Sequence, residues 1–396
     1  MKLGDVADFV GGGTPSKSNP DFYGSGIPWV TPKDMKSWVI STSQIEITKS
    51  GLDASSAKIV PAGSVLIVVR SGILKHTLPV ALSSVDVSLN QDMKAIVVKP
   101  GIDSSYLARL VKASEPTVLG WVRATTADNF PVDNLKRLEF MLPPLDEQRR
   151  IAAVLDHVDA LRTKRRESID LIGSVVQSAF QSRFGDPGTW SSSWPMGTIG
   201  DMSESVQYGT SAKAGARGAW PMLRMGNVTD DGRLDLSDLK FIDLVDSDLA
   251  KYVVRRGDLL FNRTNSKEKV GKAAVVRTDR PLAIAGYLLR VRVKPQHSGE
   301  FISAYLRSRH GRAVRRGMAK AAVNQANINA KEMRSITIAL PPADLQAAFA
   351  ADVARVELAR SSAERHLAEL DTLFASLQSR AFAGELDVSK VVLPNQ

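Results

Sequence analysis

A stretch that occurs twice constrains this chain more than any other feature of its sequence. The first copy runs from Leu142 to Gly185 and the second from Leu340 to Gly384, and each opens with Leu-Pro-Pro followed closely by Asp and Gln. The two copies are offset by 198 residues in a chain of 396 residues. A repeat of this length predicts that the protein is built from two similar halves.

Each copy carries hydrophobic residues at alternating steps of four and three, which is the a/d pattern of a coiled coil. Arg162 and Arg360 interrupt this pattern at corresponding places near the middle of each copy. Because both copies keep the same register, we expect them to pair with each other as a rigid strut rather than to form two unrelated surface helices. Our interpretation of the whole chain makes this helix pair antiparallel. The predicted seam consists of Ile151, Leu155, Val158, Ile169, Ile172 and Val176 in the first copy, and of Phe349, Val353, Val356, Leu367, Leu370, Phe374 and Leu377 in the second.

The boundaries of the two predicted helices are marked by proline, aspartate and glycine. Pro143-Pro144 and Pro341-Pro342 suit the positions just before a helix, because proline has no backbone N–H to donate. Asp146 and Asp344 are predicted to be the N-caps. The glycines that close the two copies are predicted to end the helices. Each helix should then span roughly 35 to 40 residues, or about 55 Å at a rise of about 1.5 Å per residue.

The helices divide the chain into five segments. These are a first globular block (1–141), a first spacer helix (142–185), a second globular block (186–339), a second spacer helix (340–386) and a tail (387–396). Both blocks contain short strand-like runs, scattered helices and many turns, which predicts an α+β fold with a pseudo-two-fold internal repeat. Short segments of the two blocks match in the same order: Gly13-Thr14, for example, corresponds to Gly209-Thr210. The blocks differ between landmarks, which suggests one task performed on two different targets.

Composition narrows the class of partner. The formal net charge of +10 and an isoelectric point of about 9.7 favour a polyanion such as nucleic acid. Cysteine is absent, so disulfides and thiolate metal sites are excluded, and the five His residues show no metal-ligand spacing. Without a long apolar run or a signal-like N-terminus, we expect a cytoplasmic protein that does not span a membrane.

The Leu-Pro-Pro-x-x-x-Gln motif that opens a long helix, the occurrence of that helix twice, and the shared frame of the two blocks together resemble the specificity (S) subunit of type I restriction–modification systems. The resemblance extends over nearly the whole chain. The second copy departs from the first, because Leu345 stands where the first has Glu147, and Ala347-Ala348 replace Arg149-Arg150. This difference weakens the expectation that both helices meet a partner identically.

The resemblance implies a non-catalytic role within a larger enzyme complex. Each block would be a target-recognition domain that reads one half of a split, asymmetric sequence in double-stranded DNA. The helix pair would fix the unread gap and dock two methyltransferase (M) subunits, which carry S-adenosylmethionine and methylate adenine N6. Restriction (R) subunits with ATP and Mg would complete the complex. This chain itself would bind no cofactor and no metal.

Candidate DNA-reading residues come from polar and basic side chains in turn-rich segments. Arg and Lys can bind guanine in the major groove, and Asn or Gln can bind adenine, although most basic residues at such interfaces contact phosphates. Each candidate could therefore read a base, bind a phosphate or be ordinary surface. The candidates are Lys17, Arg70, Ser71, Lys75, His76, Gln91 and Arg123 in the first block, and Lys213, Arg217, Arg224, Asn227, Arg263, Asn265, Lys267, Asn324 and Gln325 in the second. The basic run from Arg309 to Lys320 is either a phosphate-binding helix face or a solvated one.

Two short motifs imitate an adenine methyltransferase. Phe9 to Gly13 fits a glycine-rich cofactor loop, and Asn19 to Phe22 resembles a catalytic tetrapeptide. They lie too close together for the strand and helix that a nucleotide-binding unit needs between them, so we interpret both as turns and expect no catalytic residues.

Other functions remain open at this point: a stand-alone methyltransferase or nuclease, a helical adaptor that never reads DNA, or the S subunit of a combined restriction–methylation polypeptide.

Overall fold

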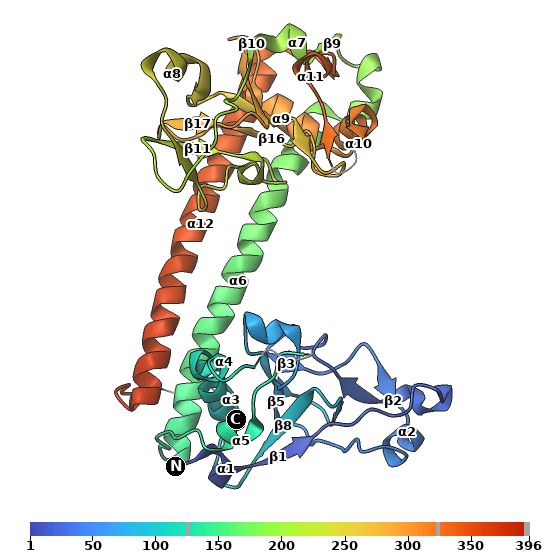
Figure 1. Cartoon of the computed structure of the whole chain (residues 1–396), viewed down its shortest axis with the longest axis vertical. Helices are drawn as coiled ribbons and strands as arrows, with labels where there is room; N and C mark the ends of the chain where they lie inside the picture. Colours follow the sequence, from blue (N-terminus) through green and yellow to red (C-terminus); the bar gives the residue numbers. More distant parts are fainter. Residues whose placement is uncertain (124–126, 322–324, 392–396) are drawn as a thin grey trace. The chain divides into compact units, whose positions relative to one another are not determined.

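The computed structural model describes residues 1–123, 127–321 and 325–391 (Figure 1). The chain divides into two compact units, one formed by Met1–Lys164 with Leu367–Gln396 and the other by Arg165–His366. Both divisions fall inside long helices. Helix α6 (Leu145–Phe184) and helix α12 (Ala343–Ala383) therefore each contribute residues to both units.

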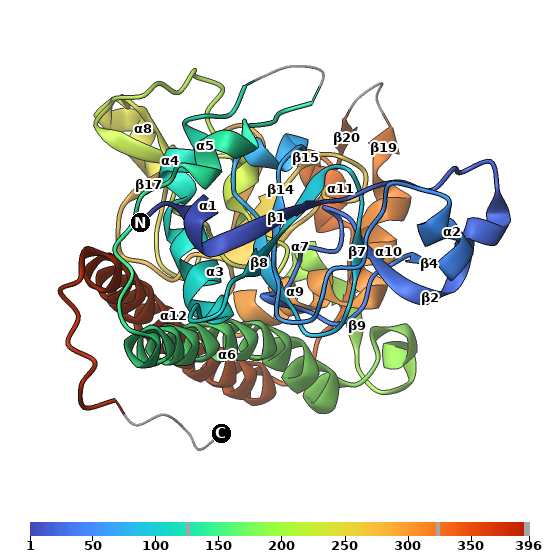
Figure 2. The same cartoon turned by 90° about the horizontal axis from the view of Figure 1, so that it is seen from below.

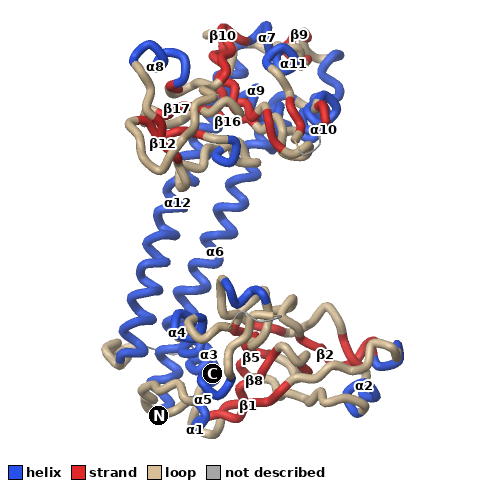
Figure 3. Tube along the Cα trace, viewed as in Figure 1, coloured by secondary structure: helices blue, strands red, loops and turns tan. Residues whose placement is uncertain are grey.

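The first unit is built on a five-stranded sheet in the order β1-β8-β5-β6-β3, and α3 packs against β5 and β6. Figure 3 labels α3 and the strands β1, β8 and β5 of this sheet. A second sheet has the order β4-β2-β7. Strand β5 is a run of four apolar residues that are all buried, as expected for a central strand covered on both faces. The bounds are α1 (Leu3–Val6), β1 (Ala7–Gly11), η1 (Pro20–Phe22), β2 (Tyr23–Val30), β3 (Val39–Ile40), β4 (Glu46–Ile47), α2 (Lys49–Asp53), β5 (Val65–Val68), η2 (Gly72–Lys75), β6 (Val80–Ser83), β7 (Ser88–Leu89), β8 (Met93–Val98), α3 (Ser104–Ala113), α4 (Glu115–Leu119) and α5 (Val132–Lys136).

The second unit has two four-stranded sheets, β10-β18-β14-β16 and β12-β11-β17-β13, with the smaller sheets β15-β20-β19 and β21-β9. Its core gathers aromatic residues from α6, α9 and α12. The bounds are η3 (Pro187–Ser192), β9 (Met196–Thr198), α7 (Ile199–Met202), β10 (Ser203–Tyr208), β11 (Trp220–Leu223), η4 (Met225–Asn227), β12 (Lys240–Ile242), α8 (Asp246–Tyr252), β13 (Val253–Val254), β14 (Leu259–Asn262), β15 (Thr264–Asn265), β16 (Ala273–Val275), β17 (Leu282–Ile284), β18 (Leu288–Val293), α9 (Gly299–Arg307), α10 (Arg309–Met318), β19 (Lys320–Ala321), β20 (Ala326–Asn327), α11 (Ala330–Arg334) and β21 (Thr337–Ala339).

Strand pairing confirms the predicted α+β repeat. In the first unit β2 pairs in parallel with β7, and β8 lies antiparallel to both β1 and β5. In the second unit β11 pairs in parallel with β17, and β18 lies antiparallel to both β10 and β14. The parallel registers place Leu89 opposite Val30 and Ile284 opposite Leu223, so the two turns that follow β7 and β17 are counterparts.

A glycine at a corresponding place in each unit allows two backbones to approach closely. A Cβ atom on Gly12 would lie 1.8 Å from the carbonyl oxygen of Asn90, and one on Gly209 would lie 2.2 Å from that of Ala285. No side chain fits at either position. These contacts correct the sequence alignment by one residue, because Gly209 matches Gly12 rather than Gly13.

The long helices begin and end close to the predicted positions, but their N-caps differ from the prediction. Helix α6 starts at Leu145 and α12 at Ala343, so Asp146 and Asp344 lie in the first turn and are not N-caps. Pro144 occupies the cap position of α6, and its carbonyl accepts the backbone N–H groups of Glu147 and Gln148 at 3.0 Å. Acidic side chains in a first turn still interact favourably with the helix dipole.

Glycine ends both helices as predicted. Gly185 and Gly384 have φ values of +75° and +74°, a left-handed conformation that favours glycine. At the end of α12 the N–H of Glu385 donates to the carbonyl of Arg380 at 2.8 Å, and the N–H of Gly384 donates to that of Ala381 at 3.3 Å. These two hydrogen bonds form a Schellman motif.

The predicted seam packs within each unit, and the direction of packing confirms that the helices are antiparallel. In the first unit, Ile151 and Leu155 near the start of α6 are buried with Phe374 and Leu377 near the end of α12. In the second unit, Val176 near the end of α6 packs with Phe349 and Val353 near the start of α12, as does Val356. The remaining seam residues Val158, Ile169, Ile172, Leu367 and Leu370 are buried or half-buried.

The polar interruptions of the seam are ion-paired. Arg162 contacts Asp371 of α12 at 2.6 Å and Asp159 at 2.7 Å, and its guanidinium lies 4.4 Å from the centre of the Phe374 ring. In the other unit, Arg360 contacts Asp231 at 2.6 Å. Burial of a charge costs free energy unless it is paired, so these contacts explain how arginine is tolerated at seam positions.

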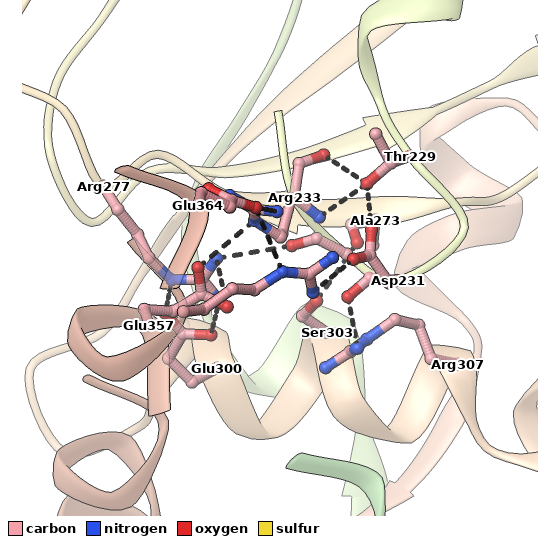
Figure 4. Close-up of polar contacts among 12 residues, drawn as sticks. Thr229, Asp231, Arg233, Ala273, Arg277, Glu300, Ser303, Arg307, Glu357 and Glu364 are labelled. Carbon is pink, nitrogen blue, oxygen red and sulfur yellow. Dashed lines mark hydrogen bonds and ion pairs between the residues drawn. The ribbon is translucent and has the colours of Figure 1, made fainter. Parts of the chain in front are cut away.

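Charged side chains also fasten each globular domain to its helix. In the first unit Arg109 of α3 binds Asp156 and Asp159 of α6 at 2.7 and 2.9 Å. In the second unit, Figure 4 shows Arg233 reaching Glu357 and Glu364 of α12, at 3.3 and 2.7 Å. The hydrogen bond to Glu364, opposed by burial, raises the pKa of Arg233. Arg277–Glu300, at 2.6 Å, and the bond from Arg307 to the carbonyl of Asp231 belong to the same network.

The glutamine of each Leu-Pro-Pro-x-x-x-Gln motif is buried and binds backbone groups. Gln148 Oε1 accepts the N–H of Asp103, the N-cap of α3, at 2.9 Å, while Nε2 donates to the Pro143 carbonyl at 2.9 Å. Gln346 does the same with Ser298, the N-cap of α9, at 3.0 Å, and with the Pro341 carbonyl at 2.7 Å. The motif thus joins the start of each long helix to the start of a helix in the domain.

Replacing Gln148 by alanine should lower the free energy of unfolding by about 1–3 kcal/mol, because the N–H of Asp103 and the Pro143 carbonyl lose a buried partner. Urea denaturation followed by circular dichroism measures this change. Gln181→Ala is the matched control, since Gln181 is exposed on the same helix and its loss should change the free energy by less than about 0.5 kcal/mol. Equal effects of the two substitutions would contradict the structural role of Gln148.

Candidate nucleic-acid interface

A hollow of about 840 Å³ in the first unit brings together four of the predicted residues. Lys17, Arg70, Ser71 and Gln91 all line it. Lys17 follows β1, Arg70 and Ser71 follow β5, and Gln91 lies in the turn between β7 and β8. The ends of separate strands therefore carry these side chains to one place, as loops on a scaffold commonly do at binding sites.

The three other first-block candidates lie beside this hollow. Lys75 and His76 are exposed at the end of η2, and Lys75 Nζ is 3.7 Å from the Asp128 carboxylate. Arg123 is exposed, and its backbone N–H donates to the carbonyl of Asn129, which lines the hollow, at 2.8 Å. Although 53 residues separate Arg70 from Arg123 in sequence, both pair through their backbones with Asn129.

The first hollow has mixed charge. Its lining includes the bases Lys17, Lys33 and Arg70 and the acids Asp34 and Asp92. Arg70 Nε lies 2.5 Å from Asp92 Oδ1, so the guanidinium is already paired with a carboxylate. Asp34 holds its own loop by accepting three hydrogen bonds, from the Thr31 amide and hydroxyl and from the Gln44 amide.

The second unit has a hollow of about 720 Å³ at the corresponding place, and its lining is basic. Lys213, Arg224 and Arg263 line it together with Lys240, and its lining includes no Asp or Glu. Lys213 follows Gly209 after the end of β10, as Lys17 follows Gly12 after the end of β1. The two hollows thus share a frame and differ in charge.

Arg263 follows strand β14 as Arg70 follows β5, but the two arginines are one residue out of register. The backbone N–H of Arg263 donates to the carbonyl of Tyr287 at 3.0 Å, as that of Val69 donates to Asp92 at 2.9 Å. Tyr287 therefore stands where the first unit has Asp92. Arg263 binds neutral groups: the side-chain oxygen of Asn327 at 3.2 Å, the Gly286 carbonyl at 3.4 Å and the Tyr208 ring, whose centre is 5.0 Å away.

The remaining second-block candidates fall into three groups. Asn265, Lys267 and Gln325 lie on or next to the paired strands β15 and β20, where Lys267 and Gln325 are exposed. Arg217 is exposed on the loop before β11, and Asn324 lies outside the residues that the structure describes.

The prediction that Asn227 contacts DNA is wrong, because its side chain is used within the fold. The residue is 4% exposed, and its amide donates to the carbonyls of Asp235 and Asp238 at 2.8 and 3.0 Å. It stabilises a turn and does not face the hollow, whereas Arg224 beside it is paired with Asp238 at 2.8 Å.

The sequence did not identify several residues of the two hollows. Lys33 and Asp34 in the first, and Lys240 and Tyr287 in the second, had no motif to mark them. Asn129 and Asn327 line the first and the second hollow, respectively. Each lies 13 residues before its Leu-Pro-Pro motif, and this shared position could have identified them.

The segments that imitate a methyltransferase have structural roles. Asn19 caps the short helix η1 by accepting the N–H of Asp21 at 3.1 Å, so the tetrapeptide is a turn as predicted. Phe9 to Gly11 belong to β1, so this part of the glycine-rich motif is a strand and not a turn. Among the residues described, no cluster of three or more His, Asp or Glu could hold a metal ion, and no helix is long and apolar enough to cross a membrane.

Solved structures share this fold. The S subunit of a type I restriction-modification system from M. genitalium matches 96% of this chain and 95% of its own with a TM-score of 0.58 at 14% identity. A second structure, described for assembly and conformational transition of the type I R-M system, matches 98% and 97% with a TM-score of 0.59 at 18% identity.

Sequence relatives cover part of the chain. The Escherichia coli EcoR124I/EcoR124II specificity subunit is 37% identical over 170 residues, which is 42% of this chain and 42% of that protein. The EcoKI specificity subunit of Escherichia coli K12 is 25% identical over 307 residues, or 72% of this chain and 66% of that one. The match to the first of these relatives therefore spans less than half of its length.

Each unit thus contains one hollow of a shared frame, lined by basic and amide side chains. The family model for the type I restriction modification DNA specificity domain matches residues 1–171. This match covers less than half of the chain, and the two halves together share the fold of the solved type I S subunit from M. genitalium.

Arg263→Ala should weaken DNA binding by about 1–3 kcal/mol, the range for loss of a good side-chain contact to a base. Arg263→Lys should not restore the affinity, because lysine cannot make a planar bidentate contact. Fluorescence anisotropy with a labelled duplex at fixed salt measures the effect, after melting curves confirm that the variants fold. Arg256→Ala is the control, since Arg256 is exposed, pairs with Asp279 at 2.7 Å and lies outside the hollow. Equal losses in both variants would exclude a special role for Arg263.

Proposed function

We propose that this chain is the DNA-specificity subunit of a type I restriction–modification complex, in which each unit reads one half of a split DNA sequence. One observation carries this proposal: two counterpart hollows keep the same strands, the same close-approach glycine and an arginine just after the central strand, but differ in the side chains around them. Two hollows with the same backbone frame and different side chains suit two DNA half-sites of different sequence. DNA bases are distinguished by such side chains in the major groove.

The helix pair is proposed to set the unread gap between the half-sites. Both α6 and α12 contribute to both units, and ion pairs join the two helices on each side of the division: Arg162–Asp371 in one unit and Arg183–Asp352 in the other. A paired helix is stiffer than a flexible linker, so it can serve as a spacer of defined length.

The partners and their chemistry follow from the same proposal. Two methyltransferase subunits with S-adenosylmethionine would use the internal repeat as two similar docking surfaces. Methylation requires the target adenine to leave the base stack. Those subunits would therefore supply the catalytic pocket, and this chain would select the DNA sequence. Restriction subunits with ATP and Mg would join the same complex. This chain would supply no catalytic group, and the complex would act on DNA in the cytoplasm.

Methylation mapping tests the proposal directly. The chain is combined with its methyltransferase subunit, S-adenosylmethionine and a pool of random duplexes, and methylated adenines are located by sequencing. We expect one motif made of two different half-sites separated by a gap of constant length. Methylation without a shared split motif would overturn the proposal, as would methyl transfer by the isolated chain.

Lengthening both helices should change the gap and leave the half-sites unchanged. One heptad is inserted after Lys164 in α6 and a matching heptad after His366 in α12, at the division between the two units, so both ion pairs described above stay intact. Seven residues add about 10 Å, which corresponds to about three base pairs at about 3.4 Å each. Arg365→Ala, an exposed change near the same point, is the control and should not alter the gap. A changed half-site would show that the helices do more than space the units.

A further inference from the structure

The formal net positive charge of this protein comes from one of its two units. Residues 165–366 contain 31 Lys and Arg against 21 Asp and Glu, whereas the rest of the chain contains 21 of each. The whole formal net charge of +10 therefore belongs to the second unit. Two units with similar folds consequently present very different electrostatic fields to a polyanion.

Part of this charge forms a stripe on α10. Arg309, Arg312 and Arg316 are exposed, and their spacing of three and four residues places them on one face of the helix. An adjoining face of the helix is buried against the rest of the unit. Arg315 is buried there and donates to the carbonyl of Val270 at 2.7 Å, and this burial lowers its pKa to about 10. Gly311 lies so close to α9 that a Cβ atom would be 2.1 Å from the carbonyl of Tyr305.

The stripe is connected to the second hollow through a short sheet. Helix α10 leads into β19, which pairs with β20, and β20 pairs with β15 (Figure 2). Thr264 of β15 and Asn327 of β20 line the hollow. Lys267 and Lys269 are exposed just after β15, and Arg316 is close enough to Glu268 between them to contribute to lowering its pKa, after hydrogen bonds from the Glu268 backbone and Ser266.

The first unit has no equivalent stripe among its described residues. There α4 follows α3 as α10 follows α9, but α4 has five residues and none is basic. Its Glu115 instead pairs with Lys112 of α3. In the hollow of the same unit Asp92 pairs with Arg70, at the position where the second unit has Tyr287.

We propose that Arg309, Arg312, Arg316, Lys267 and Lys269 form a phosphate-binding surface, and that the second unit supplies most of the salt-dependent, sequence-independent affinity for DNA. The inference rests on the proposed function and assigns the division of labour within it. The stripe spans seven residues, or about 10 Å, and can follow several phosphates spaced at about 3.4 Å along the duplex axis. The first unit then contributes chiefly to the choice of sequence.

The salt dependence of DNA binding distinguishes phosphate contacts at this surface from attraction of DNA by the net charge of the protein. The full-length chain is titrated with a random-sequence duplex by fluorescence anisotropy over a range of NaCl concentrations, and log Kd is plotted against log salt. For R309A/R312A/R316A we expect the slope to fall by about 2 to 3, because each lost phosphate contact removes about 0.9. The corresponding triple lysine variant should keep the slope, since lysine retains the charge.

A control variant removes the same charge elsewhere in the unit. K251A/R280A/K331A changes three exposed residues on α8, on the turn before β17 and on α11. It should keep the slope of the unmodified chain. An unchanged slope in the α10 variant would overturn the inference, and so would an equal fall in the control, which would indicate net charge rather than a surface. Loss of methyltransferase-subunit assembly with an unchanged slope would identify the stripe as a protein contact and would also overturn it.

The test distinguishes failure of this inference from failure of the proposed function. In the complex, the α10 variant should methylate the same split motif, with the preference for that motif over random DNA unchanged within about twofold, because phosphate contacts carry no sequence information. A changed motif would contradict the inference. Absence of any split motif with the unmodified chain would contradict the proposed function, whatever slope is measured on random DNA.

Discussion

Burial of an apolar seam between α6 and α12 is the interaction on which the rest of this structure depends. Most of the stability of a helix in a protein comes from packing of its apolar face, and the hydrophobic residues of a 40-residue helix need a partner surface. Each unit supplies that surface from both helices, with Phe374 meeting Ile151 on one side of the division and Phe349 meeting Val176 on the other. The arginines in the middle of the seam are compatible with this packing because carboxylates pair with them.

The two globular units show which parts of such a domain are constrained and which are free to vary. The strands β7 and β17 each pair with a parallel strand, and the positions of Gly12 and Gly209 leave no room for a side chain. Backbone contacts therefore constrain these positions. The turn that follows each parallel strand has no such constraint. Asp92 and Tyr287 occupy the same place there with opposite consequences for the neighbouring arginine: one is paired with a carboxylate, and the other is held by neutral groups.

The sequence predicted the architecture better than it predicted the site. Repetition, heptad spacing and the terminal glycines are patterns along the chain, so the helices and their mutual pairing could be predicted from them. Asn227 could not be judged in this way, because the sequence does not show whether an asparagine amide in a turn faces solvent or, as here, donates to two backbone carbonyls. The charge of each hollow depends on residues from distant loops, such as Arg70 and Asp92, whose pairing appears only after folding. The proline that replaces aspartate at the N-cap was missed because a backbone carbonyl leaves no signature in the sequence.

The buried glutamines have a consequence for how such a protein can change. Gln148 and Gln346 hold their domains through the backbone N–H of a helix cap, and the caps themselves are different residues, Asp103 and Ser298. Every amino acid except proline offers that N–H. A foreign domain with a helix starting at the same place would therefore fit this attachment without any matching change in the long helix. New target sequences could arise by exchange of whole blocks, while the helix pair and its partner surfaces stay as they are.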